Sequence, residues 1–200
     1  MKLLIGLGNP GPEYAGTRHN VGVRVLERFA HTHGIEFAGH RFASRFGVGR
    51  MRDGTVDVAL LAPQTFMNRS GTAVREAVAG LPIADPSSDL LVAFDDVDLP
   101  FGRLRLRPEG GAGGHRGLAD VLLRLERRDV PRLRFGVGRP PEGRETSDHV
   151  LAPFSEEEAR HLPAAIARAS EAAAAALRDG VLRAMNVFNR DPEADAEETG

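Results

Sequence analysis

Short apolar runs recur along the chain and predict the strands of a sheet. Most of these runs are continuous, as expected of strands that are buried on both faces. The predicted strands cover residues 2–7, 41–51, 56–61, 90–94, 104–107 and 133–138. Asp53 and Gly54 lie between the second and third runs, and this pair is typical of a hairpin turn.

Between these runs, apolar residues recur every three or four positions, which predicts helices. The predicted helical stretches cover about residues 20–33, 70–80, 118–125 and 155–188. Ser70 is the expected N-cap of the second stretch, and Pro163 should kink or restart the last one. Ser155 and Glu158 have the spacing of a capping box.

The alternation of strands and helices predicts a single α/β domain over residues 1–190. We expect a twisted, mostly parallel but mixed sheet with helices on both faces. Residues 191–200 contain five acidic residues and no basic one, which predicts an acidic, disordered tail.

Composition excludes several classes of protein. The chain has 200 residues, 42% of them hydrophobic, so it can build a core without disulfide or metal staples. It has no cysteine, which excludes a disulfide scaffold, a thiol nucleophile and a cysteine-ligated metal, and which fits a cytoplasmic protein. No window approaches the roughly 18 apolar residues of a membrane span, and the first apolar run is too short for a signal peptide.

The net charge of −2 hides an uneven distribution. Residues 101–144 contain 11 arginines against 5 acidic residues, an excess of six positive charges. This basic segment is a candidate contact for a phosphate backbone, and we expect Arg105 and Arg107 to lie near it. A solvated surface of mixed charge is the competing interpretation.

The sequence G-L-G-N-P-G at residues 6–11 follows the first predicted strand and matches the glycine pattern of dinucleotide-binding folds. Pro10 and Pro12 lack the N–H donors that a pyrophosphate needs, so we favour a tight turn and expect no cofactor. A third interpretation places Asn9 at the carboxyl end of a strand, facing a cleft.

His19 lies between this turn and the first predicted helix, near the sheet edge where α/β sites form. Taken alone it could be a surface or capping histidine. Asp95, Asp96 and Asp98 follow the apolar run at 90–94. They could hold a divalent metal or form a solvated turn, or the first of them could orient a histidine. We rank the metal site last because histidine ligands at metal spacing are missing.

Two further segments precede predicted helices. In T-F-M-N-R-S-G at residues 65–71, Phe66 and Met67 suit a core and Asn68 suits a turn. The glycine-rich segment at 110–117 lacks the Lys-Ser/Thr of a nucleoside-triphosphate loop, but it can form an anion-binding nest or the hinge of a lid.

Together and in this order, these motifs resemble the bacterial-type peptidyl-tRNA hydrolase family. The resemblance extends from Leu4 to about Phe188. It rests on G-L-G-N-P-G at 6–11 with Tyr14, T-R-H-N-V-G at 17–22, F-M-N-R-S-G at 66–71, D-D-V-D-L-P at 95–100 and G-G-H-R-G-L at 113–118.

The resemblance implies hydrolysis of the ester that joins a peptide to the ribose of tRNA, which recycles the tRNA of aborted translation. It implies that His19 is the catalytic base, that Asp95 supports it, and that Asn9 contacts the substrate near the ester. It also implies a monomer, with a glycine loop that acts as a lid. Further residues implied to contact the peptide or the tRNA 3′ end are Tyr14, Phe66, Met67, Asn68, Gly114 and Arg116.

Arg116 departs from the family, whose motif usually has a substrate-binding asparagine at this position. A guanidinium donates hydrogen bonds but cannot accept them, so the role of this one residue is in question. The residues themselves favour a water activated by His19, because cysteine is absent and no G-x-S-x-G nucleophile elbow is found. The alternatives are a non-catalytic RNA-binding relative, such as the chloroplast intron-splicing proteins, and a nicotinamide-dependent oxidoreductase.

Overall fold

The computed structural model describes residues 1–190, and the predicted acidic tail at 191–200 lies outside the described residues. The strands form one seven-stranded sheet in the order β2-β3-β4-β1-β5-β7-β6. The four central strands β4, β1, β5 and β7 are parallel, whereas the pairs at both edges are antiparallel. The strands are β1 (Lys2–Gly6), β2 (Gly39–Arg41), β3 (Ser44–Arg50), β4 (Asp57–Pro63), β5 (Leu90–Asp96), β6 (Leu104–Arg107) and β7 (Arg132–Gly136).

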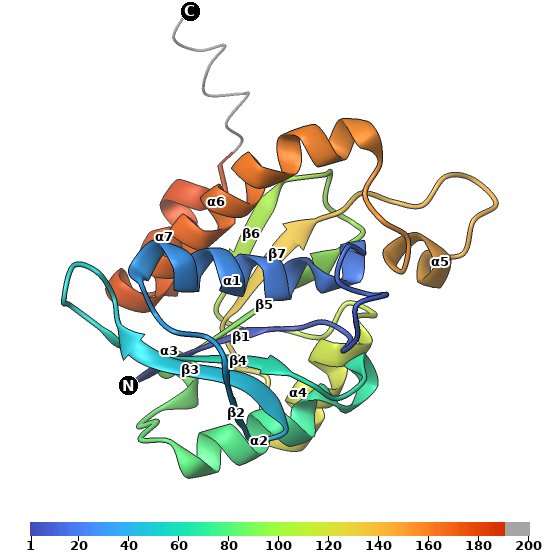
Figure 1. Ribbon diagram of the computed structural model, residues 1–200. Helices are drawn as coiled ribbons and strands as arrows, with labels where there is room; N and C mark the ends of the chain where they lie inside the picture. Colours follow the sequence, from blue (N-terminus) through green and yellow to red (C-terminus); the bar gives the residue numbers. More distant parts are fainter. Residues whose placement is uncertain (191–200) are drawn as a thin grey trace, which may run out of the picture.

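Helices cover both faces of this sheet (Figure 1). The helices are α1 (Val21–His33), α2 (Ser70–Gly80), α3 (Pro86–Asp89), α4 (Arg116–Leu125), α5 (Thr146–Val150), α6 (Glu156–Asp179) and α7 (Val181–Phe188). Two single 3-10 turns, η1 (Arg18–Asn20) and η2 (Met67–Arg69), precede α1 and α2. No helix within residues 1–190 is long and apolar enough to cross a membrane.

Each face of the sheet has its own hydrophobic core. Helices α1, α6 and α7 bury one cluster, in which Phe29 and Phe135 are among the largest enclosed side chains. Helices α2 and α4 bury the other against β1, β4 and β5. The mixed sheet and the two helix layers confirm the predicted single-domain α/β fold.

Most predicted elements are confirmed, and the expected N-cap at Ser70 is wrong. Ser70 is the first residue of α2 rather than its N-cap, and its hydroxyl donates to the Met67 carbonyl. The chain continues as one helix through Pro163, so α6 does not restart there, and the break falls at Gly180 instead. The capping box of Ser155 and Glu158 is present.

A close approach of α1 to the sheet positions the segment that carries His19. A Cβ atom added to Gly22 would lie 2.3 Å from the Ala93 carbonyl oxygen on β5. Only glycine therefore allows the start of α1 to lie this close to the strand. This contact brings η1 next to the end of β5, where Asp95 is located.

Candidate active site

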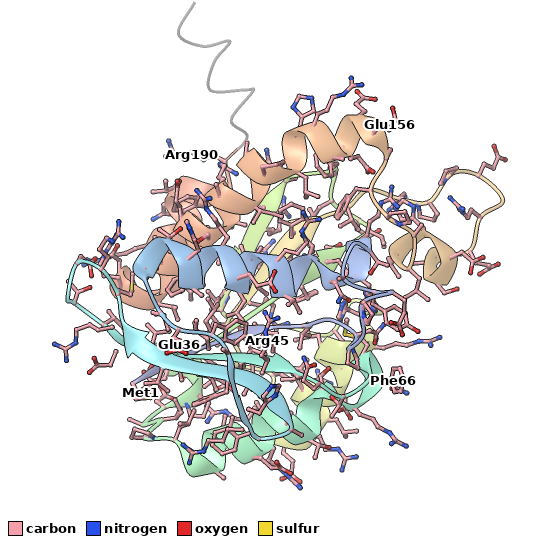
Figure 2. The ribbon with its side chains drawn as sticks, in the orientation of Figure 1. Met1, Glu36, Arg45, Phe66, Glu156 and Arg190 are labelled. Atoms are coloured by element: carbon pink, nitrogen blue, oxygen red, sulfur yellow. The ribbon has the colours of Figure 1, made fainter. Side chains whose placement is uncertain are left out.

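A cleft of about 1100 Å³ opens at the carboxyl ends of β1 and β5, the usual position of sites in α/β sheets. Its walls come from the turn after β1, η1, η2, the glycine loop before α4, the arginines of β6 and β7, and α5. The Phe66 ring stands out from the turn between β4 and α2 and is 59% exposed (Figure 2). This exposed aromatic ring is one of the residues that line the cleft.

The centre of the cleft is a buried carboxylate shared by two histidines. The Oδ1 atom of Asp95 lies 2.8 Å from Nδ1 of His19 and 3.0 Å from Nε2 of His115. Asp95 is only 3% exposed, whereas the His19 side chain is 13% exposed and lines the cleft. The pair predicted from sequence is therefore in direct contact.

Hydrogen bonding assigns the protons on both rings. Nδ1 of His115 accepts the N–H of Leu118, 3.1 Å away, and so caps the first turn of α4. Nε2 of His115 must then carry its proton and donate it to Asp95. A carboxylate only accepts, so Nδ1 of His19 also donates to Asp95. The Nε2 atom of neutral His19 consequently keeps a free lone pair, the arrangement that a general base requires.

Opposing effects act on the pKa of Asp95. Burial alone would raise this pKa, because it penalises the charged form. The attraction of His115 and the hydrogen bonds from His115 and His19 outweigh burial and hold the pKa well below its ordinary value. Asp95 is therefore an ionised acceptor at neutral pH.

Asn9 is held rigidly at the edge of the cleft. Its side-chain oxygen accepts the N–H of Met67 at 2.8 Å, which leaves the Nδ2 group available to donate. The side chain of Asn20 forms two hydrogen bonds with the Asn9 backbone. Its Oδ1 accepts the Asn9 N–H and its Nδ2 donates to the Asn9 carbonyl, each at 2.9 Å. The glycine turn thus supplies an oriented amide donor beside His19. Because η1 separates this turn from α1, the turn does not open directly into a helix as in a dinucleotide fold.

The three acidic residues after the apolar run have different partners. Asp96 pairs with Arg134 and accepts the N–H of Asp98, while Asp98 pairs with Arg139. Asp95 alone points to the histidines. The carboxylates are thus dispersed, which removes the basis for the three-acid metal site weighed from the sequence.

An arginine-rich strip lies on β6 and β7, and three of its residues, Arg107, Arg132 and Arg134, line the cleft. Antiparallel pairing sets Arg105 opposite Arg134 and Arg107 opposite Arg132 on one face of β6 and β7. Like charges directly opposite each other are unfavourable unless something neutralises them. Arg134 has Asp96, and Arg132 donates to the carbonyls of Gly110 and Gly111 at 2.8 and 2.9 Å.

Within residues 1–190, Arg105 and Arg107 have no ion-pair partner. Arg107 is exposed and lines the cleft, as does Arg116 at the start of α4. The Arg107 and Arg116 guanidinium groups are therefore accessible from the cleft, and the phosphate contact near β6 stays a prediction.

The structure gathers most of the predicted site residues at this cleft and leaves two apart. The predicted residues that line it are Asn9, His19, Phe66, Met67, Asn68, Asp95, Arg107, Gly114 and Arg116. Tyr14 and Arg105 are not among the lining residues. Sequence reasoning missed His115 and Asn20, although both lie within quoted motifs. Their partners Asn9 and Asp95 lie on other elements of the fold, 11 and 20 residues away, so the motifs alone did not indicate these contacts.

Fold and site together define a single-domain α/β protein whose sheet edge presents a histidine–carboxylate pair in an open cleft. A model of the peptidyl-tRNA hydrolase family matches residues 3–197. The chain is 47% identical to a peptidyl-tRNA hydrolase of Symbiobacterium thermophilum over 188 residues, covering 94% of this chain and 98% of the relative. It is 46% identical to that of Carboxydothermus hydrogenoformans, covering 95% and 99%.

The crystal structure of peptidyl-tRNA hydrolase from Acinetobacter baumannii superposes with a TM-score of 0.86 at 38% identity and covers 94% of both chains. The chain therefore belongs to the peptidyl-tRNA hydrolase family.

Proposed function

We propose that this protein hydrolyses the ester bond between a peptide, or an N-blocked aminoacyl group, and the ribose of tRNA, using a water activated by His19. The observation that carries the proposal is the hydrogen bond of 2.8 Å from Nδ1 of His19 to buried Asp95. It leaves Nε2 as the proton acceptor in a cleft large enough for a nucleotide and an amino acid. Membership of the family supports the same substrate.

The proposed reaction begins when Nε2 of His19 takes a proton from water and the water oxygen attacks the ester carbonyl carbon. Asp95 stabilises the imidazolium that forms. The oxyanion of the tetrahedral intermediate accepts from Nδ2 of Asn9, with Asn68 as a second donor. The intermediate collapses by breaking the bond to the ribose oxygen, and His19 returns its proton to that oxygen. The products are a free carboxylic acid and tRNA with a free hydroxyl.

The proton arrangement supports a mechanism without a metal ion. His19, Asp95 and His115 lie close enough together to suggest a ligand set. However, Nδ1 of His115 is occupied by the Leu118 N–H, so its Nε2 is protonated and has no lone pair for a metal. Binding a cation there would also break the hydrogen bonds that His19 and His115 donate to Asp95. We therefore propose an ester hydrolase that works in the presence of a chelator.

The arginine-rich strip is the proposed contact for the tRNA backbone. Phosphate oxygens would pair with Arg105 and Arg107, which have no ion-pair partner within residues 1–190, and would bring the acceptor end into the cleft. Exposed Phe66 and buried Met67 would contact the attached peptide or the terminal base. Because one chain supplies all of these contacts, we propose that the protein acts as a monomer. We also propose that it acts in the cytoplasm, where it rescues tRNA from stalled translation.

The test compares N-acetyl-aminoacyl-tRNA with free aminoacyl-tRNA at an enzyme concentration far below that of substrate, with and without EDTA. We expect many turnovers on the blocked substrate, slow turnover on the free one and no effect of EDTA. Tight tRNA binding without turnover would instead identify a non-catalytic RNA-binding protein. Loss of activity in EDTA would refute the metal-free mechanism, and binding of a nicotinamide cofactor would revive the dinucleotide interpretation.

A further inference from the structure

A buried arginine next to His19 ties the site to the beginning of α6. The side chain of Arg18 is 8% exposed, and its Nη2 atom lies 2.6 Å from Oε2 of Glu158. Its Nη1 atom faces three backbone carbonyls, those of Pro153 at 2.7 Å, His149 at 3.3 Å and Ala152 at 3.4 Å. One guanidinium thus links η1 to a segment more than a hundred residues away in sequence.

Backbone contacts reinforce this link. The N–H of Arg18 donates to the Ala152 carbonyl at 3.1 Å, and Thr17 forms an isolated antiparallel bridge with Pro153. The guanidinium also lies 5.5 Å from the centre of the Phe154 ring, within the range of a cation–π contact. The loop that carries His19 is therefore fixed to residues 149–158 by main chain and side chain alike.

Glu158 is itself immobilised, so it is a firm anchor for Arg18. The same Oε2 atom accepts the N–H of Ser155 at 2.7 Å in the capping box of α6. Burial alone would raise the pKa of Glu158, but the hydrogen bonds from Ser155 and Arg18 hold it below its ordinary value. A charged carboxylate at the end of a 24-residue helix thus fixes the position of the guanidinium.

The anchored segment includes one wall of the cleft. Val150 and Leu151 of this segment line the cleft, as do Thr146 and Ser147 at the start of α5. On its other side, His19 is followed by Asn20, which grips the backbone of Asn9. His19 consequently lies between two sets of contacts. The Thr17 backbone bridge and the Arg18 side chain together join it to the segment that includes the end of α5.

We propose that Arg18 is a positioning residue, which holds His19 against Asp95 and fixes the α5 wall at a set distance from the proposed base. A guanidinium is needed because its two terminal nitrogen atoms donate to acceptors in different directions, the backbone carbonyls and the Glu158 carboxylate. The single ammonium group of lysine cannot reach all of them. Arg18 does not touch the reacting atoms. This inference rests on the role of His19 proposed above.

The experiment compares Arg18→Lys, which keeps the charge, with Glu158→Gln, whose amide oxygen can still accept from Arg18 and Ser155. Arg50→Lys is the matched control, since Arg50 forms a two-pronged pair with Asp57 on the surface, where β3 ends and β4 begins. Single-turnover hydrolysis of N-acetyl-aminoacyl-tRNA gives the rate of the bound complex, and thermal unfolding reports stability. The ¹⁵N NMR shifts of His19 report its tautomer without any need for activity.

We expect Arg18→Lys to lower the single-turnover rate by about 10- to 100-fold, because small displacements of a positioned base cost this much. Glu158→Gln should lose less than about threefold, since its hydrogen-bond geometry persists. The His19 shifts should move from the Nδ1–H form toward a mixture of tautomers in Arg18→Lys alone. Arg50→Lys should match the wild type in every measurement.

A wild-type rate and an unchanged tautomer in folded Arg18→Lys would overturn the inference and would leave the proposed function intact. Lower melting temperature alone, with rate and tautomer unchanged, would show a merely structural role and would overturn it as well. If Arg18→Lys does not fold, Glu158→Ala removes the carboxylate partner of Arg18, and an unperturbed tautomer there counts against the inference. An inactive wild type would contradict the proposed function instead, and the NMR arm would still decide the role of Arg18.

Discussion

Replacing Asp95 by asparagine removes the charge at the centre of the site with almost no change of shape. Oδ1 of Asp95 accepts from His19 at 2.8 Å and from His115 at 3.0 Å, and the side chain is nearly inaccessible to solvent. An amide can still accept one such N–H, but it cannot stabilise the imidazolium that forms as His19 takes a proton. The change should therefore affect the transition state far more than the bound substrate.

The magnitude follows from the lost interaction. A hydrogen bond to a charged group contributes about 1.5–3 kcal/mol, and losing that amount in the transition state lowers kcat by roughly 10- to 150-fold. Loss of the Nδ1–H tautomer of His19 adds to this effect, so we expect a fall of about 100-fold or more.

The assay is kcat and KM on N-acetyl-aminoacyl-tRNA across the pH range, together with equilibrium binding of uncharged tRNA. Asp98→Asn is the matched control, since Asp98 pairs with exposed Arg139 and does not face a histidine. Asp95→Asn with normal kcat would refute the reasoning. Binding reduced as much as kcat would show that Asp95 is a structural residue.

The stability of the protein should depend on the same carboxylate. The pKa of Asp95 is lower in the folded protein than in the unfolded chain, where it is about 4. The ionised carboxylate therefore stabilises the fold fully above about pH 4, and this stabilisation is lost as the pH falls below that value. Urea unfolding at pH 7 and pH 3 should thus show a larger loss on acidification for the wild type than for Asp95→Asn. An equal loss in both would contradict the assigned direction.

Three further changes test other parts of the site. Asn9→Asp keeps the acceptor for the Met67 N–H but replaces the proposed oxyanion donor, so kcat should fall about 10²- to 10³-fold with a smaller change in KM. Equal kcat would exclude Asn9 from that role. Gly22→Ala forces a Cβ to within 2.3 Å of the Ala93 carbonyl, which should lower both the melting temperature and kcat, and an unchanged melting temperature would contradict the close approach. Arg107→Gln should weaken tRNA binding and reduce the slope of log affinity against log salt by about 0.7–0.9, whereas an unchanged slope would remove Arg107 from the phosphate contact.

The sequence could predict the features that are encoded locally. Apolar periodicity located the strands and most helices, and the capping pair at Ser155 marked the start of α6 correctly. Ser70 was misjudged because its hydroxyl turns back to the Met67 carbonyl inside the preceding 3-10 turn. At Pro163, packing of the long helix on the core outweighs the local cost of proline.

The candidate site was only partly readable for a similar reason. The family resemblance and the positions of His19 and Asp95 near the sheet edge predicted that the two residues act together. The structure shows a direct hydrogen bond between them. The proton assignment depends on His115, whose two ring atoms reach Asp95 and the Leu118 N–H in three dimensions. The contacts of Arg18 join residues more than a hundred positions apart, which no local pattern encodes.

The most direct test of the central claim is single-turnover hydrolysis of N-acetyl-aminoacyl-tRNA by His19→Ala, with tRNA binding measured on the same protein. The account predicts a loss of rate of about 10²- to 10⁴-fold, the usual contribution of a positioned acid–base group, with binding close to that of the wild type. Full retained turnover by His19→Ala would contradict it, because the attacking water would then be activated elsewhere.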